Sequence, residues 1–136
     1  MNVKDLMIGN YIYHNGDITI VSNLDIGSKS YCTINDVQIH KETFLSKQLG
    51  IKIFKGIRLT EEILLKCGFG VVTESSAGKR YAYLNNGVFS SNLAFTYWVI
   101  GKTKNKFFRG DLECKYVHEL QNLYTALSGK ELQINL

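Results

Sequence analysis

The stretch KYVHELQNLYTALSG, residues 115–129, carries the clearest structural pattern of this 136-residue chain. Its apolar and aromatic residues recur at the spacing i, i+1, i+4, i+7, i+8 and i+11: Tyr116, Val117, Leu120, Leu123, Tyr124 and Leu127. On a helical wheel these residues fill an arc of about 120°, and Gly129 is suited to end the helix. The stretch therefore predicts an amphipathic C-terminal helix that packs its apolar face on the rest of the fold.

The segments upstream of this helix show mainly strand patterns. Residues 10–22 predict a β-hairpin, because Asn15-Gly16 between apolar runs favours a two-residue type I′ turn. Residues 30–39 predict a further strand or strand pair, and residues 69–108 predict an antiparallel meander. Weaker patterns indicate a short helix at 41–49, a strand at 51–57 and a short final strand at 132–136.

A short central helix has signals at both of its ends. Thr60 is a good N-cap, Glu61 and Glu62 suit the positive end of the helix dipole, and Gly68 fits the position after the last turn. Together with the strand patterns, the two helices predict an α+β fold: an antiparallel sheet of hairpins packed by the C-terminal helix and the central helix. No linker or repeat divides the chain, so residues 1–136 are expected to form one domain.

Composition excludes several classes of protein. Hydrophobic residues make up 45% and charged residues 21% of the chain, which is typical of a globular protein rather than a disordered one. The three cysteines are widely spaced, so neither a disulfide framework nor a zinc site is expected, and no metal or cofactor is predicted. The first ten residues lack the apolar core of a signal peptide and no run is long enough to span a bilayer. These features predict a cytoplasmic protein without a membrane partner.

Three segments resemble a group of short uncharacterised proteins from Bacteroidetes genomes, phages and mobile elements. KYVHELQNLYTALSGKEL, residues 115–132, is similar to the closing motif of that group. IRLTEEILLKCGF, residues 57–69, resembles its central motif, although Arg58 stands where the group often has proline, and DLMIGNYI, residues 5–12, resembles its opening. The resemblance implies a phage or mobile-element origin and a shared fold. It implies no activity and no functional residue.

A basic and aromatic stretch, KTKNKFFR at residues 102–109, is a candidate nucleic-acid site. Cations that flank aromatic rings are the combination used to bind single strands. The candidate residues are Lys102, Lys104, Lys106, Phe107 and Arg109. The alternative is a solvated lysine-rich turn followed by a core strand. The eight tyrosines and the single tryptophan are assigned mainly to core and sheet packing, where aromatic residues are favoured.

The polar face of the C-terminal helix is unusual because its centre carries neutral side chains. His118, Gln121, Asn122 and Thr125 lie there, where a solvated face usually has Lys, Glu and Arg. We therefore expect this face to be covered by a second subunit, a partner or another part of the chain, and treat these four residues as interface candidates. Cys114 and His118 are four residues apart, a spacing that could form a thiolate–imidazole dyad or half of a metal site. Nothing in the sequence indicates a third group to orient the histidine, and a metal would need two more ligands, which only His14, His40, Cys32, Cys67 or scattered acids could supply.

No catalytic motif is recognisable, and no residue is predicted to be catalytic. The favoured function is a small non-enzymatic protein-interaction module whose partner is an unknown protein or a second copy. The first alternative is a nucleic-acid or nucleotide binder that uses the Lys102–Arg109 region. The second alternative is an enzyme without a recognisable motif.

Overall fold

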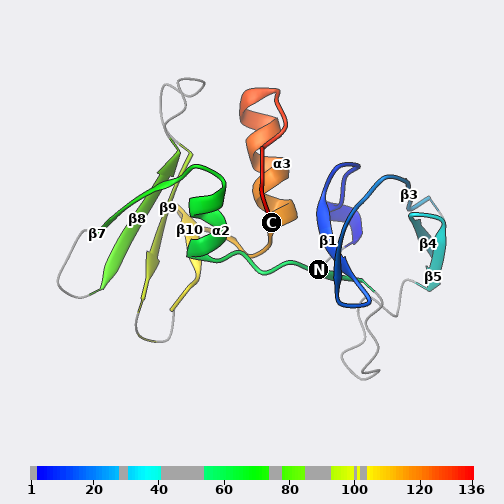
Figure 1. The fold of residues 1–136 in the computed structure, drawn as a ribbon, viewed down its shortest axis with the longest axis horizontal. Coiled ribbons are helices and arrows are strands. Elements are labelled where there is room, and N and C mark those ends of the chain that lie inside the picture. The colour runs from blue at the N-terminus through cyan, green and yellow to red at the C-terminus, as the bar shows by residue number, and fades with distance from the viewer. Residues whose placement is uncertain are drawn as a thin grey trace. The chain divides into compact units, whose positions relative to one another are not determined.

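The computed structural model describes residues 3–27, 31–40, 54–73, 78–84, 93–99, 101 and 104–136 (Figure 1). The chain divides into two compact units. Unit 1 comprises Met1–Ile57 and Tyr116–Asn122, and unit 2 comprises Arg58–Lys115 and Leu123–Leu136. That residues 1–136 form a single domain stays a prediction.

Unit 1 contains two small antiparallel sheets. Its elements are a 3₁₀ turn η1 (Val3–Asp5) and the strands β1 (Tyr11–His14), β2 (Asp17–Ile20), β3 (Leu24–Asp25), β4 (Tyr31–Ile34), β5 (Val37–His40) and β6 (Phe54–Gly56). One sheet has the order β2-β1-β6 and the other the order β3-β4-β5. The hairpin expected at residues 10–22 and the strand pair expected at residues 30–39 are both confirmed.

The first hairpin turn of unit 1 has the predicted chemistry, and the second has the same left-handed backbone conformation. Asn15 (φ 51°) and Gly16 (φ 91°) both occupy the left-handed region, as a type I′ turn requires. Asn35 (φ 50°) and Asp36 (φ 65°) do the same between β4 and β5. Asparagine and aspartate tolerate this conformation because their short side chains can bond to the local backbone.

The core of unit 1 joins residues from both of its sheets. The buried members of this cluster are Leu6, Ile12, Val21, Cys32, Ile34 and Phe54. In β1 only Ile12 is fully buried, and its neighbours Tyr11 and Tyr13 are half-buried. This pattern follows from the alternation of side chains along a strand, which turns Tyr11 and Tyr13 to the face away from the core.

Unit 2 combines a helix with a five-stranded antiparallel sheet. Its elements are α2 (Glu61–Lys66), β7 (Gly70–Thr73), β8 (Lys79–Leu84), β9 (Leu93–Trp98), β10 (Phe107–Arg109) and β11 (Leu112–Cys114), and the sheet order is β11-β10-β9-β8-β7. As expected, Thr60 caps α2 by accepting a hydrogen bond from the Ile63 N–H (3.2 Å). Gly68 follows the helix with φ 91°, a value that suits glycine.

The C-terminal helix α3 (Val117–Ser128) contributes to both units, up to Asn122 in unit 1 and from Leu123 in unit 2. Val117 and Leu120 are fully buried and Gly129 (φ 70°) ends the helix, as predicted. The inclusion of Leu127 in the buried arc is wrong, because its side chain is 45% exposed.

The α+β class is confirmed, but several details differ from the sequence-based expectation. The strands form three sheets in the described part of the chain. Residues 132–136 form no strand, although Leu132 and Ile134 are buried. The β10–β11 hairpin, which turns at Gly110-Asp111, was not expected. The helix predicted at 41–49 and the first residues of the strand predicted at 51–57 lie outside the described residues.

Candidate functional site

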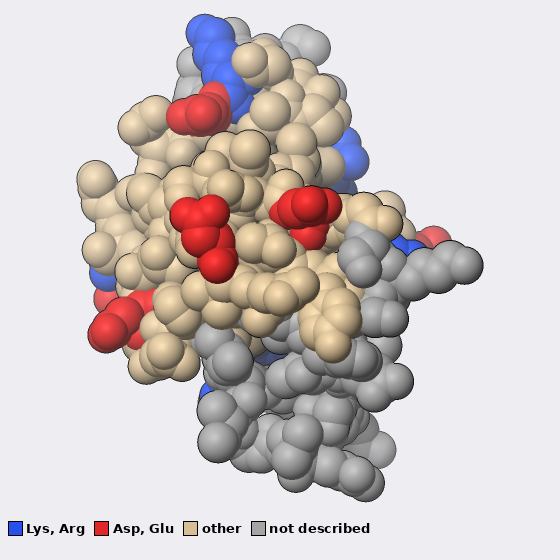
Figure 2. Space-filling view, turned by 90° about the vertical axis from the view of Figure 1, so that its right-hand side faces the viewer, with Lys and Arg blue, Asp and Glu red and all other residues tan. Residues whose placement is uncertain are grey.

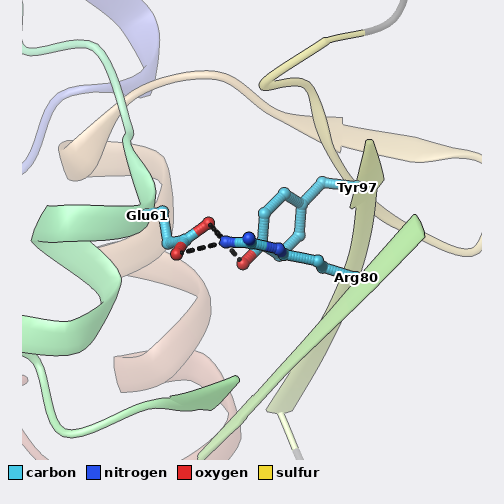
Figure 3. Close-up of polar contacts among 3 residues, drawn as sticks. All are labelled: Glu61, Arg80 and Tyr97. Atoms are coloured by element: carbon cyan, nitrogen blue, oxygen red, sulfur yellow. Dashed lines mark hydrogen bonds and ion pairs between the residues drawn. The ribbon is translucent and has the colours of Figure 1, made fainter. Parts of the chain in front are cut away.

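A polar cluster attaches α2 to one face of the five-stranded sheet (Figure 3). Nη1 of Arg80, from β8, donates to both carboxylate oxygens of Glu61 in the first turn of α2 (2.7 and 2.8 Å). The hydroxyl of Tyr97, from β9, donates to Oε2 of the same carboxylate (3.0 Å). The Glu61 carboxylate therefore has partners from two strands and is explained as a structural tie between the helix and the sheet.

The cluster also perturbs two of its own groups. Burial, assisted by the hydrogen bond to Glu61, raises the pKa of Tyr97 to about 12. The hydrogen bond and charge of Glu61 hold the pKa of Arg80 above its ordinary value. Arg80 is thus a cation and Tyr97 a neutral hydrogen-bond donor at every physiological pH, so neither of these two groups exchanges protons near neutrality.

The alternation of side chains divides the sheet into two faces with different character. Ala82, Phe95, Tyr97 and Phe107 are at most 1% exposed and form the inner face, on the side where Arg80 and Tyr97 reach α2. The residues between them point the opposite way. This outer face carries four half-buried aromatic rings: Tyr81 and Tyr83 from β8, Trp98 from β9 and Phe108 from β10. We call these four residues the aromatic face.

Strand pairing places the aromatic face on three adjacent strands. Tyr81 and Phe108 both lie opposite Thr96 of the intervening strand β9. The rings of Tyr81 and Tyr83 are 6.2 Å apart between centroids, with an interplanar angle of 28°. Their spacing along β8 and the register across the sheet together spread the rings over one continuous surface.

Gly70 on β7 makes room for one of these rings. It lies directly opposite Tyr83, and a Cβ at Gly70 would stand 2.8 Å from Cζ and 2.9 Å from the hydroxyl oxygen of Tyr83. These distances are shorter than real carbon contacts allow, so any side chain at position 70 would displace the ring. The glycine therefore lets the Tyr83 ring lie over the neighbouring strand.

Cations border the aromatic face. Lys79 lies opposite Trp98 on the neighbouring strand β8. Lys104 pairs with Trp98 through an isolated backbone β-bridge on the opposite edge of β9. Lys104 is exposed and Lys106 half-buried. Glu113 lies opposite Phe108 and is an acid at the border of this face, but its carboxylate is 3.8 Å from Nζ of Lys115.

Only some residues of the predicted basic stretch, 102–109, are exposed to solvent as the sequence suggested. Lys102 lies outside the described residues, whereas Lys104 and Arg109 are exposed. Phe107 is 1% exposed and packs against Tyr97, with ring centroids 4.7 Å apart, so its ring belongs to the core. Because β10 alternates, its neighbour Phe108 carries the outward ring that sequence analysis assigned to Phe107.

The interface candidates on α3 are held by the N-terminal segment of the same chain. Gln121, 8% exposed, accepts a hydrogen bond from the Tyr11 N–H (2.9 Å) and donates to the Gly9 carbonyl (3.1 Å). Asn122 accepts from Nδ2 of Asn10 (2.8 Å) and donates to the backbone carbonyl of Asp5 (2.6 Å). The two amides thus bond to residues 5–11 within unit 1. Thr125 is half-buried.

His118 is the most unusual of the four candidates. Its side chain is fully buried, and neither ring nitrogen has a hydrogen-bond partner among the described residues. The ring stacks on Tyr116, with centroids 5.4 Å apart and an interplanar angle of 12°. Burial lowers the pKa of His118 below its ordinary value, so the imidazole is neutral at physiological pH.

The described residues offer no metal centre, since no group of three His, Cys, Asp or Glu side chains gathers in this part of the chain. Cys32, Cys67 and Cys114 are all buried and form no disulfide. Burial raises the pKa of Cys67 to about 11, which keeps that thiol protonated and a poor nucleophile at neutral pH.

No family model, curated protein or solved structure matches the chain. The resemblance to the Bacteroidetes phage group therefore stays a prediction. Within the described ranges, no helix has the length and hydropathy that crossing a bilayer requires.

The sequence does not reveal the aromatic face, because aromatic residues are favoured in sheet packing as well. The available signal was the two-residue spacing of Tyr81 and Tyr83 and of the outward positions on β9. That spacing alone does not say which set of residues faces the core. The contact of Arg80 and Tyr97 with α2 decides this, and it joins segments that are distant in the sequence.

Proposed function

We propose that the chain is a non-enzymatic protein-interaction module of phage or mobile-element origin, and that unit 1 supplies the contact surface. The observation that carries the proposal is an exposed apolar surface on the β2-β1-β6 sheet. Tyr11 lies opposite Ile20 and Tyr13 opposite Ile18, all on the face away from buried Ile12. We call these four residues the outer face of unit 1.

The two isoleucines of the outer face are exposed, and its two tyrosines are half-buried. Ile18 and Ile20 are 46% and 48% exposed, on a strand where a soluble surface usually carries polar side chains. Met7 and Ile8 add two further exposed apolar side chains, 50% and 69% exposed. The Gly9 N–H donates to the Val21 carbonyl (2.7 Å), which brings this preceding segment beside the end of β2. Contiguous exposed apolar residues are typical of protein-binding sites.

The position of β2 favours contact with another polypeptide. It is the terminal strand of its sheet among the described residues. Nδ2 of Asn35 donates to the Ile20 carbonyl at the end of this edge (2.9 Å), so Ile18 is the residue whose outward backbone groups have no neighbouring strand in the described part of the chain. An edge strand can add a strand from a partner through backbone hydrogen bonds, while pockets between side chains supply specificity. The sequence Asp17–Ile20 contains neither lysine nor proline, the two residues that most often block such pairing.

The charge of unit 1 suits contact with protein rather than with a polyanion. Unit 1 contains six Lys and Arg against six Asp and Glu, so its net charge is zero. On the side of the molecule at the right of Figure 1, the described side chains that Figure 2 shows are mostly uncharged, with a few acidic ones among them and basic ones toward the edges of the view. Depletion of charge at the centre is the compositional feature of protein interfaces.

The experiment that tests the proposal compares two variants of the whole chain. Ile18→Lys/Ile20→Lys should abolish self-association in light scattering, or remove the specific partner captured by cross-linking in host lysate. The control is Leu112→Lys, which replaces an apolar residue that is 76% exposed in unit 2. Both variants should melt like the unmutated protein. If the protein is monomeric and the Ile18/Ile20 variant captures the same proteins as the control, the proposal is wrong.

A further inference from the structure

We infer that the aromatic face of unit 2 binds single-stranded nucleic acid by stacking bases on its rings. This site is independent of the interaction surface proposed for unit 1. The four rings of Tyr81, Tyr83, Trp98 and Phe108 point away from the buried side of the sheet and are half-buried. A half-buried ring on a sheet presents its polarisable surface without having to leave the fold.

The layout of the rings suits several bases at once. Neighbouring strands lie ~4.8 Å apart, and residues two apart on a strand are separated by ~6.6 Å. Rings on three adjacent strands can therefore take separate bases. The geometry is fixed by packing, because Tyr81 and Tyr83 stack on each other and Tyr83 lies over Gly70. Rings that are already ordered lose little conformational freedom when a base binds.

The charge of unit 2 complements a phosphate backbone. Unit 2 contains ten Lys and Arg against six Asp and Glu, so it carries the whole net charge of +4. Lys79 and Lys104 lie on either side of Trp98, and Lys106 precedes the strand that presents Phe108. The acid at this border, Glu113, has Lys115 as an ion-pair partner. Rings beside cations are the arrangement that binds single strands with little sequence preference.

A single strand fits this face better than a duplex. In a duplex the bases are stacked and paired, so their faces are closed to side chains on a flat sheet, whereas a single strand can turn its bases onto the rings. The four rings contact any base through its π-face and read no pattern of donors and acceptors. We therefore expect strong dependence on strandedness and weak dependence on sequence.

Trp98 provides a direct probe, because it is the only tryptophan of the chain. Titration of the full chain with oligothymidylate of about 15 nucleotides, the upper range for one sheet-based site, should quench its fluorescence to saturation. The logarithm of the affinity should fall with the logarithm of salt concentration, with a slope of about −0.7 per phosphate contacted. Lys104→Gln should make that slope shallower.

Paired variants separate stacking from general attraction. Tyr81→Leu and Tyr83→Leu should each weaken binding about fivefold or more, as loss of one stacked base predicts, while Tyr81→Phe should bind like the unmutated protein. Tyr13→Leu, which alters a half-buried tyrosine in unit 1, is the matched control and should have no effect. Trp98→Phe should retain binding to a labelled oligonucleotide in fluorescence anisotropy.

Three results would overturn the inference. One is the absence of any quenching of Trp98 at low salt. Another is equal affinity for a duplex of the same length or for heparin, since both supply charge without accessible bases. The third is equal binding by the Tyr81→Leu and Tyr81→Phe proteins. If the leucine variant does not fold, equal affinity of Trp98→Leu and Trp98→Phe for the labelled oligonucleotide overturns the inference in its place.

Discussion

Replacing Gln121 by alanine should destabilise unit 1 strongly, although the residue lies on the polar side of its helix. The carboxamide accepts a hydrogen bond from the Tyr11 N–H and donates one to the Gly9 carbonyl, at 2.9 and 3.1 Å. Tyr11 is the first residue of β1, and Gly9 (φ 93°) precedes it in a turn. Alanine removes both bonds and leaves two backbone groups without those partners.

The size of the effect follows from these contacts. Each hydrogen bond contributes about 1 kcal/mol net, and a buried group left without a partner costs about 1–3 kcal/mol. Gln121 is 8% exposed, so water replaces the lost partners poorly. The free energy of unfolding should therefore fall by about 2–4 kcal/mol. That is a large share of the roughly 5–15 kcal/mol that stabilises a typical domain.

Urea denaturation followed by circular dichroism measures this difference, with Thr125→Ala as the control. Thr125 is half-buried on the same helix, and its side chain has no hydrogen bond within the described part of the chain. Asn122→Arg should also destabilise, because a cation would replace an amide bonded to Asn10 and to Asp5. Hydrogen exchange should show the Tyr11 amide losing protection in Gln121→Ala. A fall of less than about 0.5 kcal/mol, with Tyr11 still protected, would refute this account of the helix face.

Two further predictions concern the same helix. Leu120→Ala, at a fully buried site, should lower the free energy of unfolding by about 2–5 kcal/mol. Leu127→Ala, at a site that is 45% exposed, should lower it by well under half as much. Equal urea midpoints for the two variants would contradict the observed burial. Burial lowers the pKa of His118 below 6.5 in the folded chain. Above about pH 6.5 the imidazole is neutral in both the folded and the unfolded chain, so His118 does not lower the free energy of unfolding there. As pH falls below 6.5, the unfolded chain gains protons first and the free energy of unfolding drops by up to ~1.4 kcal/mol per pH unit. Denaturation at about pH 7.5, 6 and 5, which spans the unfolded-state pKa of histidine, should show this loss in the unmutated chain and a shallower one in His118→Phe; identical pH dependence in both proteins would argue against it.

The sequence by itself determined the elements that depend on local chemistry. Asn15-Gly16 sets its hairpin because these residues tolerate positive φ, and Thr60 starts α2 because its side chain bonds a backbone N–H three residues on. The arc from Val117 to Tyr124 follows from helical periodicity. The sequence also shows that the polar face of α3 has neutral side chains at its centre, but it does not show that residues 5–11 bond to that face.

Only the tertiary structure decided which residues of each element meet which partners. Gln121 and Asn122 bond to residues more than a hundred positions away, and Leu127 is 45% exposed although its spacing matches that of Leu120. Phe107 and Phe108 are equivalent in the sequence, yet one packs on Tyr97 and the other faces outward. The reason is physical: alternation along a strand creates two faces, and only a contact between distant segments, here Glu61 with Arg80 and Tyr97, chooses the one that is buried.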